Sequence, residues 1–297
     1  MPETVPPPAP VAVSVADAVR SAAQRLHAAG VPDPQVDAEL LMAHVLGSSR
    51  GGVQAAAVRG DRMPESAARA LAPLIDRRAA REPLQHLTGL APFRSMELAV
   101  GPGVFVPRPE TEMVAQLAID ALRSAASEAP IAVDLGTGSG AIALAMATEV
   151  PYSRVFAAEN SVDAFVWTKQ NVARLGAENV TLAFVDLADA FPELDGTVSV
   201  VASNPPYVPD DAIPRDPEVR LYDPPAALYG GPDGLDAVRH LSRVGLRLGH
   251  SGATLVIEHG EWQGAAIRDI LTADGWRSAA THPDLTSRDR ATTATRP

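Results

Sequence analysis

A glycine-rich turn is the feature of this sequence that most constrains its fold. Gly136, Gly138 and Gly140 lie between the short apolar run 131–133 and the apolar, helix-length segment 141–149. Glycines at this spacing let a strand turn tightly into a helix, let the two elements pack closely and let the backbone approach a ligand. The pattern therefore predicts a strand, a turn and a helix within an α/β domain.

Short apolar runs recur after this turn, and helix-length or loop segments separate them. They comprise residues 155–158, 180–185, 198–202 and 253–257. This alternation is typical of a parallel sheet with helices on both faces. Residues 278–282 and 291–296 are predicted to form an antiparallel hairpin at one edge of the sheet. We therefore expect an α/β fold with a Rossmann-like sheet over residues 109–297.

The first part of the chain has a helical pattern instead. Ser14 precedes an apolar-periodic stretch that ends before Gly30, which is typical of a capped amphipathic helix. A second helix is predicted after Pro32 and a third over residues 64–81, because apolar residues recur there at helical spacing. Residues 12–82 are therefore predicted to form a small helical bundle.

Two further segments complete the predicted organisation. Residues 1–11 are rich in proline and lack aromatic residues, which is typical of a disordered tail. Residues 83–108 contain short β-like runs broken by glycine and proline, which predict a hairpin linker. The length of 297 residues, 46% of them hydrophobic, permits one large core and a smaller second domain.

Composition excludes several classes of function. The sequence has no cysteine, which rules out disulfides and thiolate chemistry, and its seven histidines lack metal-ligand spacing, so no metal is expected. It has neither an apolar run long enough to span a membrane nor a signal-peptide pattern, so we expect a cytoplasmic protein. Residues 91–297 carry twenty-seven acidic and sixteen basic residues, which argues against stable nucleic-acid binding.

Three residues at predicted strand ends form a candidate cofactor site with the glycine loop. Glu159 ends the second apolar run, where a carboxylate can accept hydrogen bonds from both ribose hydroxyls. Asp186 closes the next run and can accept from an adenine amino group, and Leu187 can pack on the purine ring. All three are also compatible with ordinary strand ends. This pattern alone leaves a dinucleotide and S-adenosylmethionine both open.

The motif Asn204-Pro205-Pro206-Tyr207 follows the run 198–202 and indicates the chemistry. The two prolines lack backbone donors and leave carbonyl groups free to accept. A planar NH2 group can donate to the Asn204 side-chain oxygen and the Pro205 carbonyl, while Tyr207 packs on the flat substrate group. Since an amide nitrogen is a poor nucleophile, alignment and removal of a proton during or after transfer must supply the rate. The motif predicts methylation of a planar nitrogen, although a rigid exposed turn is the alternative.

With these motifs the chain resembles the HemK/PrmC family of protein N5-glutamine methyltransferases over roughly residues 84–290. The resemblance is carried by Pro107-Arg108-Pro109-Glu110-Thr111-Glu112, the glycine loop, the Asn204 motif and Glu258-His259-Gly260. It implies methyl transfer from S-adenosylmethionine to the glutamine of the Gly-Gly-Gln loop in class I peptide chain release factors. Residues 12–82 are then expected to dock the release factor. We expect a monomer.

The resemblance also implies the site residues. The cofactor-binding residues would be Arg108, Thr111, Gly136, Thr137, Gly138, Ser139, Gly140, Glu159, Asp186, Leu187 and Asn204. The glutamine amide would be held by Asn204, Pro205, Pro206 and Tyr207. Arg108 and Thr111 are equally compatible with an ordinary helix start. Two positions depart from the family pattern: Leu187 stands where an aromatic residue is frequent, and Asp223 replaces the more common glutamate.

Three other functions are compatible with parts of this pattern. An adenine or guanine N-methyltransferase would present the same flat NH2 group to the site, but the acidic balance of residues 91–297 argues against it. A glutamine methyltransferase acting on a large-subunit ribosomal protein would share these motifs and differ in the helical domain. A nucleotide-binding scaffold without catalysis would show no methyl transfer.

Overall fold

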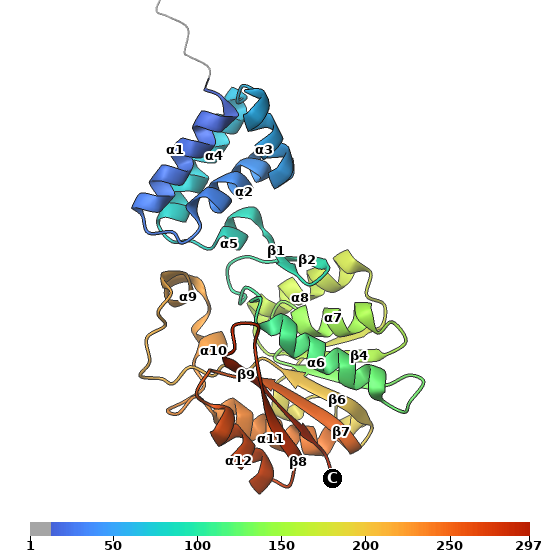
Figure 1. The fold of residues 1–297 in the computed structure, drawn as a ribbon. Helices are drawn as coiled ribbons and strands as arrows, with labels where there is room; N and C mark the ends of the chain where they lie inside the picture. Colours follow the sequence, from blue (N-terminus) through green and yellow to red (C-terminus); the bar gives the residue numbers. More distant parts are fainter. Residues whose placement is uncertain (1–12) are drawn as a thin grey trace, which may run out of the picture. The chain divides into compact units, whose positions relative to one another are not determined.

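Two compact units divide the chain after Thr88 in the computed structural model, which describes residues 13–297. The predicted tail over residues 1–11 lies outside the described residues. Each unit has a hydrophobic core of its own, so the two are described separately (Figure 1).

Helices build the whole of the first unit. They are α1 (Val15–Ala28), α2 (Pro34–Leu46), α3 (Arg50–Arg59), α4 (Glu65–Ala79) and α5 (Leu84–Thr88). Their buried side chains, among them Leu26, Leu41 and Leu71, form one core. The Ser14 side chain accepts a hydrogen bond from the Asp17 backbone amide, which confirms the predicted cap of α1.

Two helices of this unit differ from the sequence-based expectation. No helix was predicted at the position of α3. This helix contains adjacent glycines and fully buries only Val53, so it has little apolar periodicity. Its first turn is held by Arg50, whose Nε donates to Glu39 Oε2 at 2.7 Å. Helix α5 occupies part of the segment predicted as β-like, because burial of Leu87 in the helical core outweighs the local pattern.

A seven-stranded sheet organises the second unit, with the strand order β5-β4-β3-β6-β7-β9-β8. The strands are β3 (Ile131–Leu135), β4 (Arg154–Glu159), β5 (Val180–Phe184), β6 (Val198–Ser203), β7 (Gly249–Glu258), β8 (Arg277–Pro283) and β9 (Asp289–Thr295). Strands β3 to β7 run parallel, and β9 pairs antiparallel with both β7 and β8. The predicted edge hairpin is confirmed.

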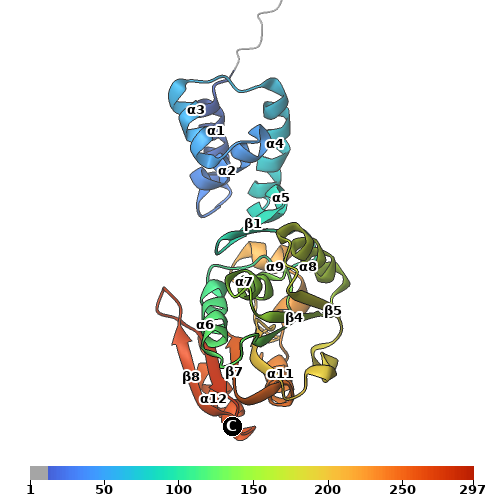
Figure 2. The ribbon, with the colours of Figure 1, turned by 90° about the vertical axis from the view of Figure 1, so that its right-hand side faces the viewer.

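Helices cover both faces of this sheet, as Figure 2 shows. Helices α6 (Thr111–Ser124), α7 (Ala141–Glu149) and α8 (Val162–Leu175) pack on one face, and α11 (Asp236–Leu248) and α12 (Gly264–Ala273) pack on the other. Successive strand residues serve opposite cores: Ala132 belongs to the first and Val133 to the second. This two-sided burial explains the continuous apolar runs and confirms the predicted α/β class.

The order of the sheet reverses at β3, because the chain moves from β3 to β4 on one side and later returns to β6 on the other. In such sheets a crevice opens at the carboxyl ends of the strands beside the reversal. Short elements lie in the connections: the hairpin β1 (Leu90–Phe93) and β2 (Met96–Ala99), η1 (Leu187–Asp189), η2 (Pro192–Leu194), α9 (Pro217–Tyr222) and α10 (Pro225–Leu228). The topology therefore predicts where a ligand binds.

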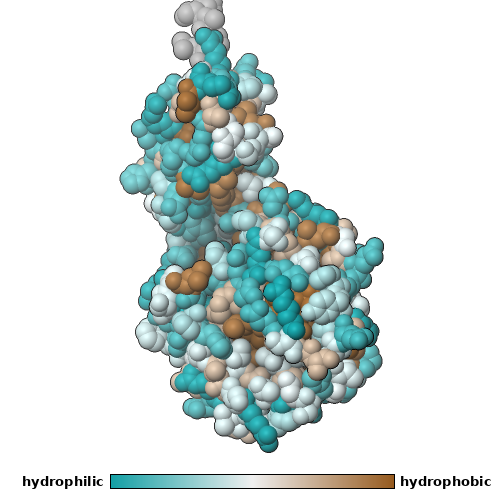
Figure 3. Space-filling model, turned by 45° about the vertical axis from the view of Figure 1, so that its right-hand side comes forward, coloured by the Kyte–Doolittle hydropathy of each residue, from teal (hydrophilic) through white to brown (hydrophobic). Residues whose placement is uncertain are grey.

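The surface drawn in Figure 3 is mainly hydrophilic, with small separate apolar groups. Large exposed apolar side chains include Trp262 and Leu285. Within residues 13–297, no helix is both long and apolar enough to cross a membrane, and no group of acidic or histidine side chains is arranged to hold a metal.

Candidate active site

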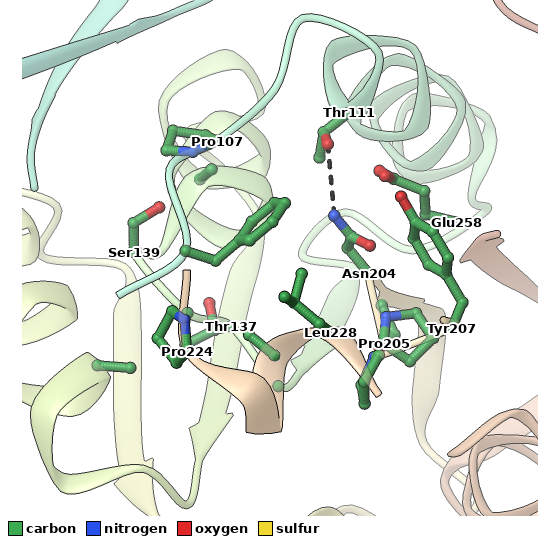
Figure 4. Close-up of a pocket in the computed structure, with 18 of the residues that line it drawn as sticks. Pro107, Thr111, Thr137, Ser139, Asn204, Pro205, Tyr207, Pro224, Leu228 and Glu258 are labelled. Carbon is green, nitrogen blue, oxygen red and sulfur yellow. Dashed lines mark hydrogen bonds between the residues drawn. The ribbon is translucent and has the colours of Figure 1, made fainter. Parts of the chain in front are cut away.

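A cavity of about 430 Å³ opens at the carboxyl ends of β3, β4, β6 and β7 (Figure 4). It lies wholly within the second unit. Sequence-predicted residues that line it are Arg108, Thr111, Gly136, Thr137, Gly138, Ser139, Glu159, Leu187, Asn204, Pro205, Pro206 and Tyr207. Gly140 and Asp186, which were predicted with them, do not line it. The predicted motifs therefore meet in one cavity.

The glycine loop takes a conformation that side chains disfavour. Gly136, Gly138 and Gly140 have φ angles of 72°, 58° and 87°. A Cβ atom on Gly136 or Gly138 would meet no atom within 4 Å, so the space beside the backbone is open to a ligand. A Cβ on Gly140 would approach Leu144 at 3.0 Å, because Gly140 begins α7 below the cavity.

Asp134 fixes the shape of this loop from inside the protein. Its Oδ2 accepts hydrogen bonds from the Thr137 hydroxyl at 2.6 Å and the Ala143 amide at 3.1 Å. Burial raises the pKa of Asp134 to about 7, and hydrogen bonding from Thr137 and Ala143 opposes that rise. The side chain therefore supports the loop rather than presenting a charge to water.

Glu159 connects the glycine loop to the start of α8. Its carboxylate accepts from the backbone amides of Gly138 at 2.8 Å, Asn160 at 3.0 Å and Ser161 at 2.8 Å. It is 7% exposed and lines the cavity. Charge-assisted bonds of this kind hold a carboxylate in a defined position. A ligand in the cavity would meet a fixed acceptor here.

Asp186 is engaged elsewhere, which explains its place outside the cavity. Its Oδ1 accepts from the Ala188 amide at 3.0 Å and caps η1, and its Oδ2 accepts from the Asn160 side chain at 3.0 Å. Leu187, the next residue, does line the cavity. The predicted contact of Asp186 with adenine stays a prediction.

The Asn204 motif follows β6 at the cavity, and neighbouring segments hold its backbone in place. A Cβ on Gly230 would lie 2.3 Å from the Pro206 carbonyl oxygen, and one on Gly234 would lie 2.2 Å from that of Tyr207. Only glycine permits this approach. Gln263 adds a hydrogen bond from Nε2 to the Tyr207 carbonyl oxygen at 2.9 Å. The 230–234 turn and Gln263 therefore fix the backbone of the motif.

Arg108 joins two segments beside the cavity. Its guanidinium pairs with Asp223 Oδ2 at 2.5 Å and lies over the Phe105 ring at 4.8 Å. Burial raises the pKa of Asp223 to about 6, while the charge and hydrogen bond of Arg108 oppose that rise. The pair ties the segment before α6 to the segment after α9, and the shorter Asp223 still reaches the arginine.

Comparison with known proteins gives the family. Residues 17–89 match the family model described as PrmC N-terminal domain, and residues 95–217 match Methyltransferase small domain. The chain is 49% identical over 279 residues to the release factor glutamine methyltransferase of Streptomyces coelicolor, covering 93% of this chain and 96% of that protein. The chain belongs to the release factor glutamine methyltransferase family. The resemblance inferred from the motifs is thereby confirmed.

Other relatives extend this comparison. The release factor glutamine methyltransferase of Mycolicibacterium smegmatis is 43% identical over 283 residues, which cover 94% of this chain and 96% of that protein. A 4-amino-L-phenylalanine/4-methylamino-L-phenylalanine methyltransferase of Streptomyces pristinaespiralis is 40% identical over 226 residues, or 75% of this chain and 76% of that protein. This relative is thus named for an amino group on an amino acid and not for a glutamine amide.

Glu258 is a cavity residue to which sequence reasoning assigned no role, although its motif was part of the family resemblance. It ends β7 beside Asn204, since Ser203 and Ile257 are partners in the parallel β6–β7 pair. It is 2% exposed, and burial raises its pKa to about 7. A glutamate at the end of an apolar run was the available signal, but the pairing of β7 with β6 was needed to use it.

Replacing Glu258 by glutamine is expected to stabilise this family member above neutral pH. The pKa of about 7 in the folded protein exceeds the value of 4.5 that is usual for a glutamate. The contribution of Glu258 to stability is therefore fully present below pH 4.5 and is lost as the pH rises to about 7, because the unfolded chain releases this proton first. Removing the buried charge should raise the unfolding free energy at pH 8 by about 3 kcal/mol.

Urea unfolding of both proteins at pH 4 and pH 8 measures this difference. The variant should gain stability at pH 8 and match the unchanged protein at pH 4. The exposed Glu193 provides the matched control, since Glu193→Gln should change neither value. An equal gain at both pH values would show that relief of the buried charge is not the cause.

Proposed function

We propose that the protein transfers the methyl group of S-adenosylmethionine to the side-chain amide nitrogen of the glutamine in the Gly-Gly-Gln motif of class I peptide chain release factors. The observation that carries this proposal is the shared cavity: Asn204 and Pro205 line it together with Glu159 and the open glycine loop. Membership of the release factor glutamine methyltransferase family supports the choice of substrate.

The residues present fit S-adenosylmethionine. Glu159 offers a fixed carboxylate for ribose hydroxyls, and Gly136 and Gly138 leave open space beside their backbone. Leu187 offers an apolar contact for the purine, and Arg108 and Thr111 line the same cavity. When bound, the cofactor supplies an electrophilic methyl group on a sulfonium sulfur. Asp186 and Gly140 would act from outside the lining, through the adenine edge and the start of α7.

The protein's own groups would align the substrate nitrogen. The Asn204 side-chain oxygen and the Pro205 carbonyl accept the two hydrogens of the glutamine NH2 and so define its plane. Pro206 keeps the backbone rigid, and Tyr207 packs on the amide and excludes water. Burial raises the pKa of Tyr207 to about 12, so its hydroxyl stays neutral. The nitrogen gains the methyl group as the bond between that methyl and sulfur breaks, and it releases one proton to solvent. Its fixed alignment supplies most of the rate.

Labelled cofactor with separately purified substrates tests the proposal. Incubation with release factor should label the release factor, whereas ribosomes, DNA and 4-aminophenylalanine should remain unlabelled. Label on DNA or ribosomes without label on release factor would contradict the proposal. Since the proposed substrate acts in translation, the proposed place of action is the cytoplasm, and a monomer is expected on gel filtration.

We also propose that the parts of the chain have separate roles. Residues 12–82 dock the release factor, residues 83–108 connect the two domains, and residues 109–297 carry out the methyl transfer. Two observations support this proposal. The helices have a hydrophobic core of their own, and residues 1–90 carry equal numbers of basic and acidic side chains, nine arginines and nine acidic residues. The first unit would therefore contribute affinity for the substrate and no chemistry.

Deletion of residues 1–88 is expected to abolish methylation of intact release factor while S-adenosylmethionine affinity is retained. The physical reason is the loss of docking contacts, which supply binding energy remote from the reacting atoms. A short Gly-Gly-Gln peptide, which cannot use those contacts, is the control and should be methylated slowly and equally by both proteins. Equal rates on intact release factor before and after deletion would refute the docking role.

A further inference from the structure

Three segments bring polar groups together around Asn204 on the side of the cavity opposite the glycine loop. Asn204 follows β6, Glu258 ends β7, and Thr111 begins α6 (Figure 4). The Asn204 Nδ2 atom lies 3.4 Å from Thr111 Oγ1. The side chains of Thr111 and Asn204 both act to lower the pKa of the nearby Glu258 carboxyl, against the larger upward effect of burial. These three side chains form the inner triad of the site.

We propose that Glu258 is a positioning residue that fixes which way the Asn204 amide faces. This inference rests on the methyl transfer proposed above and adds a residue to it. An ionised carboxylate can only accept hydrogen bonds. In the arrangement that we propose, the Thr111 hydroxyl donates to Glu258 and its lone pairs accept from the Asn204 NH2 group, which lies 3.4 Å away. With its NH2 used in the triad, Asn204 turns its oxygen to the substrate.

Burial makes this arrangement specific. Glu258 is 2% exposed and Thr111 is 3% exposed, so water cannot readily replace either partner. Within the described residues, Glu258 Oε2 is buried without a hydrogen-bond partner. An unpaired buried acceptor is costly, so the carboxylate strongly favours every donor that reaches it. The amide orientation that sends the Asn204 NH2 inward is the one that relieves this cost.

The protonation state of Glu258 then controls the amide. Burial raises its pKa to about 7. Glu110, just before α6, raises this pKa further, whereas Arg290 of β9 lowers it, and the neutral Tyr207 hydroxyl also faces the carboxylate. When Glu258 binds a proton it becomes a donor, the Thr111 hydroxyl can reverse, and either orientation of Asn204 becomes satisfied. Ionised Glu258 is therefore the active form.

The pH dependence of methyl transfer tests the proposal. The unchanged protein should show kcat rising with pH through about 7 and level above it. Glu258→Gln should show no such rise, and its kcat at pH 8 should be lower by about 10- to 100-fold, the value of a charged hydrogen bond. KM for release factor and affinity for S-adenosylmethionine should stay unchanged. Glu193→Gln, an exposed replacement of the same kind, should keep the original profile.

Substitutions at Thr111 provide a second test, which does not alter the Glu258 carboxylate. Thr111→Val removes the hydroxyl between Glu258 and Asn204 and should lower kcat, whereas Thr111→Ser keeps it and should recover most of the loss. This pair tests the proposed role of the hydroxyl independently of Glu258→Gln. A rise through the same pH in Glu258→Gln, or equal kcat for the valine and serine variants, would overturn the inference. Absence of methyl transfer to release factor by the unchanged protein would instead refute the proposed function.

Discussion

Replacing Asn204 by alanine is expected to lower kcat for release factor methylation by about 10²- to 10³-fold, a loss typical of removing one group that aligns or stabilises the reacting atoms. Affinity for S-adenosylmethionine should remain, because Glu159 and the glycine loop lie on the other side of the cavity. Asn204 itself is only half-buried, so its removal leaves little strain. Single-turnover kinetics and calorimetry measure the two quantities.

Asn179→Ala is the matched control for this experiment. Asn179 donates to the carbonyl oxygens of Ala147 and Ser153, and it does not line the cavity. Its loss should lower stability and leave kcat nearly unchanged. If Asn204→Ala lost cofactor affinity by the same factor as kcat, Asn204 would be a cofactor residue rather than a holder of the substrate amide.

Replacing Glu159 by alanine is expected to lower cofactor affinity and to leave kcat at saturating cofactor largely unchanged, the opposite of Asn204→Ala. S-adenosylmethionine affinity should fall by about 100-fold, since two charge-assisted hydrogen bonds to ribose are lost. The carboxylate also holds the amides of Gly138 and Ser161, so the glycine loop should loosen as well. Saturating cofactor should restore most of kcat, because the Asn204 motif is intact.

Calorimetric titration with S-adenosylmethionine measures this loss, and the exposed Glu178 provides the control, since Glu178→Ala should bind normally. Unchanged affinity in Glu159→Ala would mean that the carboxylate only supports the loop. A fall in kcat that excess cofactor does not restore would place Glu159 in the transfer itself. The two variants, at Asn204 and Glu159, thus separate the two halves of the cavity.

Much of the second unit was predictable, because its signals are local. Gly136 to Gly140 need left-handed backbone that only glycine adopts readily, and the apolar runs reflect burial on both faces of the sheet. Glu159 and Asn204 stand at strand ends, which parallel strands bring to one edge. Their positions in the sequence were therefore enough to predict that Glu159 and Asn204 lie at the same edge of the sheet.

Other features depend on contacts between distant segments. Helix α3 has adjacent glycines and depends on Glu39 of α2, so its own periodicity is weak. Gln263 reaches the Tyr207 carbonyl across fifty-six residues, and Arg108 reaches Asp223 across one hundred and fifteen. Such pairings follow from strand order and register, which the pattern of apolar runs does not specify. The role of Glu258 became visible only with β7 beside β6.

The most direct test of the central claim is to map the methyl group on release factor after incubation with this protein and S-adenosylmethionine. Peptide mass spectrometry should find one added methyl group on the side chain of the Gly-Gly-Gln glutamine, and a release factor with that glutamine replaced should remain unmodified. Methylation at another residue, or of the variant release factor to the same extent, would contradict the account.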